Sequence, residues 1–259
     1  MVLALHGTAA TGKDSRWEHP TSPQCSHARL LPPLGFVVLT PDGPTAGERL
    51  GPDDVAFDSD PFYARSPGWS MFGKYAWEAI RAVDFVHALA AEDSRVDASR
   101  IGAMGTSLGA EWAIVAMCFD DRITCGAANN GWVPFRTDTN EADYNTPSRW
   151  ARAPGLLFSY MPNLAPYYVN DVPPPLDWHE ILAMVAPRPL LNCAAWQDEC
   201  FQDAAGIPEA CELAAQVWEL LGAAERFSYI MADVDHGHFD AELIHDWLTR
   251  WLRPPVPRS

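Results

Sequence analysis

A serine between two glycines is the part of this chain best suited to covalent chemistry. The segment Gly105–Gly109, with Ser107 at its centre, follows the apolar run Arg100–Met104 and opens the helix-forming run Ser107–Cys118. A serine on a tight turn from a strand to a helix is the usual setting of an activated hydroxyl nucleophile. Side chains at Gly105 and Gly109 would clash where the backbone segments of such a turn meet. Gly-x-Ser-x-Gly alone is a weak signal, and the expected strand and helix around it make Ser107 the candidate nucleophile.

A serine hydroxyl at neutral pH needs a base to take its proton and an acid to orient that base. In hydrolases with this type of turn, the acid follows a later strand and the histidine follows the last one. Asp198 follows the apolar run Pro189–Ala194, and His236 follows the run Phe227–Met231. The order along the chain therefore predicts a catalytic triad of Ser107, Asp198 and His236.

Each of the two partners has a competitor close by. His238 is the alternative base, but His236 comes first after its strand and is followed by Gly237. Glu199 is the alternative acid, but Asp198 is the first carboxylate of its loop and is short enough to hold an imidazole in one tautomer. We favour His236 and Asp198, with both alternatives open.

Acyl transfer also requires two backbone N–H groups that face the developing oxyanion. One is expected from Leu108, directly after the nucleophile at the start of its helix. The other is expected from the loop after the first strand, at Thr8, with Ala9 as the second choice.

The segment 236–240 also reads as His-x-His-x-Asp, which is typical of metallo-hydrolases. Those sites need further histidines grouped elsewhere, and this segment lies near the C-terminal end without such a group. We therefore expect no metal and, since a serine triad needs none, no cofactor.

Charge and composition restrict the partners of the chain. Its 259 residues carry a formal net charge of −16 with a pI near 4.7, which argues against nucleic acid. No apolar run approaches the ~18 residues of a membrane span, and residues 1–7 do not resemble a signal peptide. The six cysteines include no Cys-x-x-Cys, so we expect reduced, buried thiols in a cytoplasmic protein, with a Cys193–Cys200 disulfide as an alternative. The expected partner is a small-molecule ester substrate, and a homo-oligomer is compatible with the sequence.

Six apolar runs predict strands and four periodic runs predict helices, in alternation. The strands are Val2–Leu5, Phe36–Thr40, Arg100–Met104, Ile123–Ala128, Pro189–Ala194 and Phe227–Met231. The helices are Tyr75–Ala91, with Trp77 on its apolar face, Ser107–Cys118, Glu209–Leu221, and Ala241–Leu252, with Leu243 in its apolar stripe. This alternation predicts one α/β domain over residues 1–259 with a mostly parallel, doubly wound sheet and reactive groups at the carboxyl ends of its strands.

Two segments rich in proline and aromatic residues, Gly43–Gly73 and Trp132–Trp178, interrupt the alternation. Long loops in compact domains are usually lids or binding walls, so we expect the segment at about 132–178 to be a lid or pocket wall. Trp132, Tyr160 and Trp69 are the expected substrate contacts, which would suit an apolar or ring-bearing ester of aryl, sugar or polyketide type. The alternative is that these aromatic side chains simply pack on the sheet.

The chain resembles the α/β-hydrolase superfamily over nearly its whole length, and more narrowly the dienelactone-hydrolase-like and acetyl-xylan-esterase-like serine hydrolases. The segments that carry the resemblance are Leu5–Thr8 with Gly12–Asp14, Thr40–Asp42 with Gly47–Arg49, Trp69–Gly73, Arg100–Gly102, Trp178–Leu182 and Ala186–Leu190. The chain departs from dienelactone hydrolases in having a serine nucleophile in place of cysteine, and Gly109 is followed by Ala110 and Glu111. The first two antiparallel strands usual in the superfamily are absent from this sequence, so the resemblance implies a sheet that lacks the first N-terminal strands.

The resemblance implies a serine hydrolase that cleaves a carboxylic ester through an acyl-enzyme intermediate. The same triad would serve a thioesterase, lactonase, peptidase or biosynthetic acyl transferase or cyclase, because a hydrolase fold does not determine the bond that is cleaved. A further alternative, from a different functional class, is a binding protein that has the hydrolase fold but catalyses no reaction.

Overall fold

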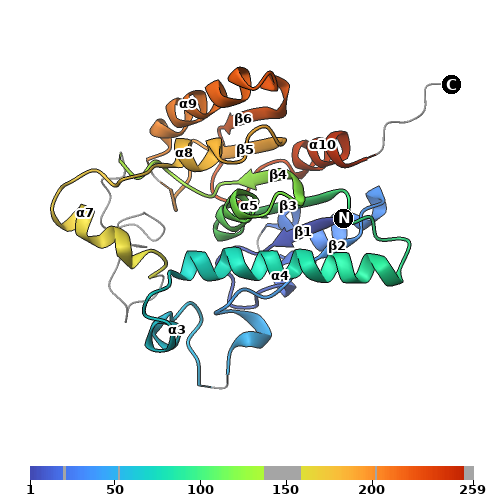
Figure 1. Ribbon diagram of the computed structural model, residues 1–259, viewed down its shortest axis with the longest axis horizontal. Helices are drawn as coiled ribbons and strands as arrows, with labels where there is room; N and C mark the ends of the chain where they lie inside the picture. Colours follow the sequence, from blue (N-terminus) through green and yellow to red (C-terminus); the bar gives the residue numbers. More distant parts are fainter. Residues whose placement is uncertain (20–21, 52, 137–158, 202, 254–259) are drawn as a thin grey trace.

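A six-stranded parallel sheet forms the centre of the molecule in the computed structural model, which describes residues 1–19, 22–51, 53–136, 159–201 and 203–253 (Figure 1). The strand order is β2-β1-β3-β4-β5-β6, and every neighbouring pair is parallel. The strands are β1 (Val2–Leu5), β2 (Val38–Leu39), β3 (Ile101–Thr106), β4 (Ile123–Asn129), β5 (Leu190–Ala195) and β6 (Phe227–Ala232). All six predicted strands are found, and the predicted doubly wound α/β architecture is confirmed.

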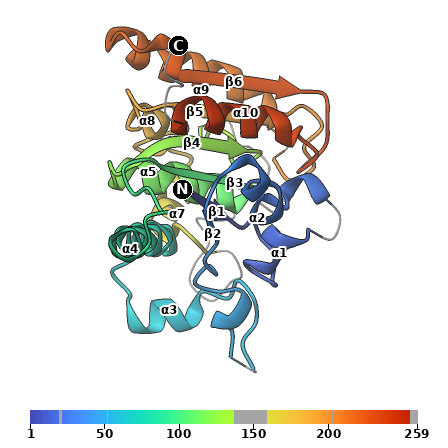
Figure 2. The same ribbon diagram turned by 90° about the vertical axis from the view of Figure 1, so that its right-hand side faces the viewer.

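Helices cover both faces of the sheet (Figure 2). The described α-helices are α1 (Asp14–Trp17), α2 (His27–Leu30), α3 (Asp60–Arg65), α4 (Met71–Glu92), α5 (Leu108–Phe119), α7 (Ala165–Val169), α8 (Trp178–Ala183), α9 (Ile207–Leu220) and α10 (Ala241–Leu252). Helices α4, α5, α8 and α9 pack on one face, and α2 and α10 pack on the other. The four helices expected from periodicity all form, within four residues of their predicted ends.

The sheet has a hydrophobic core on each of its faces, and alternate residues of each strand pack into one core or the other. In β1, Leu3 packs into the core under α4 and α5, whereas Val2 packs into the core under α10. In β5, Leu190 and Leu191 divide in the same way. Because successive strand side chains point to opposite faces, a sheet covered on both sides needs apolar residues at every position. This requirement explains why the strands appear in the sequence as continuous apolar runs.

Two residues assigned to apolar helix faces lie outside them. Trp77 of α4 is 41% exposed and Leu243 of α10 is 42% exposed. The buried stripe of α4 follows Met71, Tyr75 and Ala79, and Trp77 is two residues, or about 200°, away from Tyr75 around the helix. The ammonium group of Lys74 lies 4.1 Å from the centroid of the Trp77 ring, so this ring is partly covered by a cation.

Two further findings concern the cysteines and the membrane. All six cysteines are free thiols, so the alternative of a Cys193–Cys200 disulfide is wrong. Among the described helices, none is both long enough and apolar enough to cross a lipid bilayer.

Candidate active site

Ser107 lies on the turn between β3 and α5 in a backbone conformation that is unusual for its residue type. Its φ of 58° and ψ of −131° place it at positive φ, which a non-glycine residue adopts only when the surrounding structure holds it there. The Ser107 amide donates to the carbonyl oxygen of Asn129 at 2.9 Å, which ties the turn to the end of β4. The hydroxyl makes no capping hydrogen bond to α5. This is the nucleophile-elbow geometry, with the hydroxyl group raised above the carboxyl end of the sheet.

The glycines around Ser107 allow three backbone segments to meet. A Cβ atom built at Gly109 would overlap the carbonyl oxygen of Leu5, and one at Gly105 would overlap the backbone of Gly109. A Cβ atom at Gly7 would lie 2.9 Å from the carbonyl oxygen of Thr106 and 3.4 Å from Cβ of Ser107. The predicted clashes at Gly105 and Gly109 are confirmed.

Asp198 and His236 are brought together from the loops after β5 and β6. His236 Nδ1 lies 3.0 Å from Asp198 Oδ1 and 2.9 Å from Oδ2. Because an ionised carboxylate only accepts, Nδ1 is the donor, and Nε2 carries the lone pair that a general base needs. The Phe201 ring lies 5.7 Å from the His236 ring and covers the imidazole from one side.

The Asp198 carboxylate is buried and receives three further N–H groups. The backbone amides of Cys200 and Phe201 donate to Oδ1 at 2.8 and 2.9 Å, and Asn130 Nδ2 donates to Oδ2 at 2.8 Å. These bonds hold the carboxylate in one orientation toward the imidazole.

The two competitors occupy other positions. His238 Nδ1 pairs with Asp235 Oδ1 at 2.5 Å, and its side chain is 47% exposed. Glu199 Oε2 accepts the backbone N–H of His236 at 3.1 Å, so it contacts the histidine through the backbone. Of the two histidines, His236 is therefore the one that the structure pairs with Asp198.

Ser107 and His236 line the same cavity, which has a volume of about 360 Å³. Its walls come from the loop after β1, the segment from α1 to α2, the nucleophile turn and the loops after β5 and β6. The lining residues are Gly7, Thr8, Ala9, Arg16, His19, Ser22, Cys25, Thr106, Ser107, Glu199, Cys200, His236, Gly237 and His238. We refer to this cavity as the catalytic pocket.

Cys25 connects the two sides of the catalytic pocket. Its thiol lies 3.6 Å from Thr106 Oγ1 and donates to the carbonyl oxygen of Gly237 at 3.4 Å. Gln24 Nε2 donates to the same carbonyl oxygen at 2.8 Å. The buried Cys25 side chain thus joins Thr106, which precedes Ser107, to Gly237, which follows His236.

The expected oxyanion donors lie on the loop after β1 and at the start of α5. Thr8 and Ala9 line the catalytic pocket, and Leu108 is the first residue of α5. Among the described residues, neither the Leu108 N–H nor the Thr8 N–H has a hydrogen-bond acceptor. The N-terminus of α5 adds a positive partial charge at this point, which favours an anion.

His6 holds the loop that carries Thr8. It is fully buried, its Nδ1 donates to the carbonyl oxygen of Gly7 at 2.7 Å, and its Nε2 accepts from the Gly43 amide at 2.7 Å. Burial lowers the pKa of His6 to about 4, so the ring is neutral in this tautomer. The role of His6 in holding this loop was not predicted from the sequence.

The three predicted substrate contacts do not line the catalytic pocket. Trp132 is 2% exposed, stacks on Trp178 and donates from Nε1 to Asn192 Oδ1 at 2.9 Å. Tyr160 is 1% exposed, and its ring packs against Phe72. Trp69 is half exposed and is not among the residues that line the catalytic pocket. The rings of Trp132 and Tyr160 belong to the core, as the alternative proposed, and the role of Trp69 stays a prediction. The lid predicted at about 132–178 includes residues 137–158, which lie outside the described part of the chain.

Several residues of the site were missed in the sequence. Asn130 follows β4 with a φ of 48°, and its amide reaches Asp198 across 68 positions of sequence. The pair Asn130-Gly131 at the end of an expected strand was an available signal, because asparagine tolerates positive φ. Arg16 and Cys25 carried no comparable signal.

One group of side chains could offer three metal ligands. Ligand atoms of Asp198, Cys200 and His236 lie within 4.8 Å of one another. Both Asp198 oxygens already accept N–H groups, however, and Nδ1 of His236 faces the carboxylate. This arrangement is that of an acid–base pair, in which N–H groups already occupy the acceptor positions of the Asp198 carboxylate that a cation would use.

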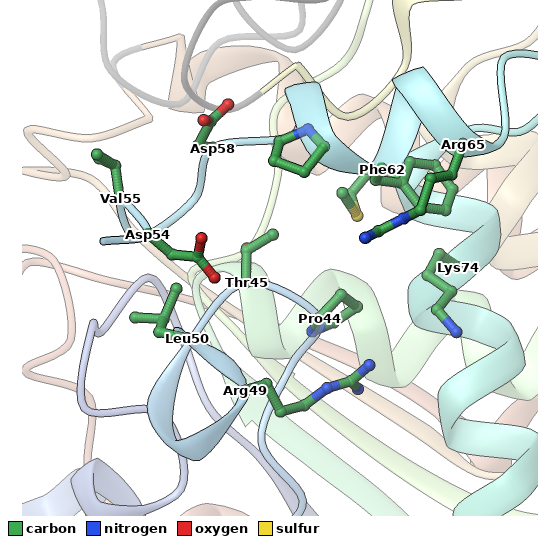
Figure 3. Close-up of a pocket in the computed structure, with 12 residues that line it drawn as sticks. Pro44, Thr45, Arg49, Leu50, Asp54, Val55, Asp58, Phe62, Arg65 and Lys74 are labelled. Carbon is green, nitrogen blue, oxygen red and sulfur yellow. The ribbon is translucent and has the colours of Figure 1, made fainter. Parts of the chain in front are cut away.

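A second cavity, of about 130 Å³, lies beside α3 and the start of α4 (Figure 3). Arg49, Arg65 and Lys74 approach it from one side, and Asp54 and Asp58 from the other. Its lining contains neither serine nor histidine. The catalytic pocket is therefore the better candidate for nucleophilic chemistry.

Known proteins resemble the chain in sequence and in fold. Residues 60–222, more than half of the chain, match the family described as "Glucuronyl esterase, fungi". A "4-O-methyl-glucuronoyl methylesterase" of Phanerochaete carnosa is 22% identical over 217 residues, which are 80% of this chain and 51% of that protein. The chain thus spans about half the length of this curated relative.

Solved structures share the fold at low sequence identity. An esterase described as a promiscuous CE15 esterase from a marine bacterial metagenome superposes with a TM-score of 0.71 at 14% identity, over 96% of this chain and 73% of that one. A CE15 glucuronoyl esterase from Teredinibacter turnerae superposes with a TM-score of 0.62 at 20% identity, over 96% of this chain and 66% of that one. The predicted α/β-hydrolase fold is confirmed by these structures.

Proposed function

The chain belongs to the glucuronyl esterase family, and from this premise we propose that it hydrolyses carboxylic esters with Ser107 as the nucleophile. His236 is the general base and Asp198 the orienting acid. The observation that carries the proposal is the 2.9 Å contact between His236 Nδ1 and Asp198 Oδ2, which joins the loops after β5 and β6 at the pocket of Ser107.

In the first half of the reaction, the Ser107 hydroxyl attacks the ester carbonyl while its proton passes to Nε2 of His236. The negative charge on the carbonyl oxygen is stabilised by the N–H groups of Leu108 and Thr8. His236 then gives its proton to the departing alkoxide, and the alcohol leaves an acyl group on Ser107. Asp198 stabilises the imidazolium that forms between these two transfers.

In the second half, a water molecule attacks the acyl-enzyme. His236 accepts a proton from the water, and the tetrahedral intermediate collapses to the carboxylic acid and free Ser107 as the proton returns to the serine oxygen. Every proton transfer in both halves uses the same imidazole nitrogen, Nε2 of His236.

The substrate class that we propose is an ester of a carbohydrate acid. Support comes from the relative named 4-O-methyl-glucuronoyl methylesterase and from the fold neighbours named glucuronoyl esterases. The methyl ester of glucuronic acid is the simplest probe, since its hydrolysis releases methanol.

Active-site labelling and product analysis test the proposal together. We expect a fluorophosphonate probe to label the wild type and the wild type to release methanol from methyl glucuronate. Ser107→Ala should lose both properties while keeping its circular dichroism spectrum. Equal labelling of wild type and Ser107→Ala would refute Ser107 as the nucleophile.

The same triad could act on another bond. A panel of matched oxygen esters, thioesters, lactones and amides would identify the preferred bond from the products. A labelled wild type that prefers the thioester by a large factor would replace the esterase proposal with a thioesterase. A ligand that binds the wild type and is recovered unchanged would favour a binding protein.

A further inference from the structure

Arg16 is a buried cation in the wall of the catalytic pocket, and no residue in the described part of the chain forms an ion pair with it. It lies on α1, just after the loop that carries Thr8, and is 1% exposed. It lines the same cavity as Ser107 and His236. Its side-chain atoms Nε and Nη1 are buried and, in the described part of the chain, have no hydrogen-bond partner.

The titratable neighbours of Arg16 supply no negative charge. His19 and His27 have pKa values lowered first by burial and then by the Arg16 charge, so both rings are neutral. Burial raises the pKa of the Cys25 thiol, which is therefore protonated at neutral pH. A guanidinium is not deprotonated in proteins, so Arg16 is a buried charge whose titratable neighbours His19, Cys25 and His27 are neutral.

The carboxylates of the catalytic pocket are engaged elsewhere. Asp198 is paired with His236 and Asn130, and Glu199 accepts the His236 amide. A buried charge without a partner is costly, and such a group is retained where a ligand completes it.

We propose that Arg16 binds a carboxylate of the substrate, so that the preferred ester carries a second, free carboxylate group. This inference rests on the proposed esterase function and specifies its substrate further. Methyl glucuronate, whose only carboxyl group is esterified, probes the esterase function alone. A planar guanidinium matches a carboxylate with two parallel N–H bonds, and the low dielectric of the wall strengthens them. On a chain with a net charge of −16, a local cation is also needed to attract an anionic substrate to the pocket.

Pairs of esters that differ only in charge test the proposal. One series consists of monomethyl esters of dicarboxylic acids, and the other of acetate esters of hydroxy acids, each compared with its neutral amide counterpart. We expect wild-type kcat/KM to be higher for the carboxylate member of at least one series. Arg16→Gln should lower this value by about tenfold or more, with less than about threefold change for the amide, and Arg16→Lys should fall between.

Two results would overturn the proposal. One is a wild type without preference for the carboxylate in either series. The other is an equal loss on both members of a pair in Arg16→Gln, which would indicate that Arg16 serves the oxyanion or the fold. Hydrolysis of the neutral esters and fluorophosphonate labelling by the wild type, with Ser107→Ala as the control, report separately on the proposed function.

Ligand binding and stability provide a test that needs no turnover. Glutarate should raise the melting temperature of the wild type but not of Arg16→Met, and its neutral amide counterpart should have no effect on either. The free Arg16→Met protein should melt at the same or a higher temperature than the free wild type, because the guanidinium has no partner to lose. Equal stabilisation of wild type and Arg16→Met by glutarate would contradict the proposal.

Discussion

The side-chain amide of Asn130 donates to Oδ2 of Asp198 at 2.8 Å, and the same oxygen lies 2.9 Å from His236 Nδ1. The end of β4 therefore orients the acid that follows β5, and through it the imidazole that follows β6. Neighbouring parallel strands end at the same edge of the sheet, so three segments distant in sequence form one hydrogen-bonded chain.

Removing the Asn130 amide should slow the chemical step while leaving substrate binding nearly unchanged. Asn130→Gly is the informative variant, because glycine accepts the φ of 48° without strain. We expect kcat to fall about tenfold, in line with a lost hydrogen bond to a charged group, with KM within about twofold. Asn130→Asp, which places a second carboxylate against Asp198, should reduce kcat further.

Asn170, an exposed residue at the C-terminal end of α7, provides the control substitution to glycine. Unchanged kcat in Asn130→Gly would contradict the positioning role.

The two histidines of the loop after β6 should differ sharply in their contribution to activity. His236→Gln removes the base paired with Asp198, and we expect kcat to fall by about a thousandfold or more. His238→Gln removes a half-exposed ring that pairs with Asp235, so kcat should stay within about threefold of wild type. Steady-state hydrolysis of one ester by the wild type and both variants checks this difference. A greater loss in His238→Gln would reassign the base.

Much of this arrangement follows from local features of the sequence. Each strand is buried on both faces, so it appears as an apolar run, and the residues after β5 and β6 occupy one edge because the strands are parallel. For this reason Asp198 and His236 could be paired from the order of the chain alone.

The remaining features depend on contacts that local sequence does not encode. The aromatic character of Trp132 does not say whether its ring faces a substrate or the core, and in the structure it stacks on Trp178. Asn130 donates to a partner 68 positions away, and Arg16 is notable only because its buried Nε and Nη1 atoms have no hydrogen-bond partner in the described part of the chain. Such relationships appear only once the loops are placed in space.

A methyl group added at Gly109 should destabilise the protein strongly. Its Cβ atom would overlap the carbonyl oxygen of Leu5, so β1 and α5 would have to separate. We expect Gly109→Ala to lower the free energy of unfolding by about 2 kcal/mol or more, measured by urea denaturation. Gly68→Ala is the matched control, because a Cβ atom at Gly68 meets no atom within 4 Å, and it should change the free energy by less than about 0.5 kcal/mol. Similar unfolding midpoints for the two variants would show that the turn tolerates wider spacing.

Stability should fall as the pH is lowered from 7 to 5, before the carboxylates titrate. Burial lowers the pKa of His6 to about 4 and that of His27 well below its usual 6.5, so both are neutral in the folded protein and bind a proton on unfolding. Because the unfolded state binds more protons between pH 6.5 and 4, the free energy of unfolding falls as the pH falls through this range. For His6 alone the loss by pH 5 is about 2 kcal/mol, and His27 adds to it. Carboxyl groups with a lowered pKa, such as that of Asp42, stabilise the fold above the unfolded carboxyl pKa near 4, and this stabilisation is lost only below it.

Urea titrations at pH 7.5, 6 and 5 measure the effect, and His27→Leu, which removes one of the two buried rings, should lose less stability over the same range than the wild type. Equal unfolding midpoints for the wild type at pH 7.5 and 5 would mean that both imidazoles titrate normally in the folded state.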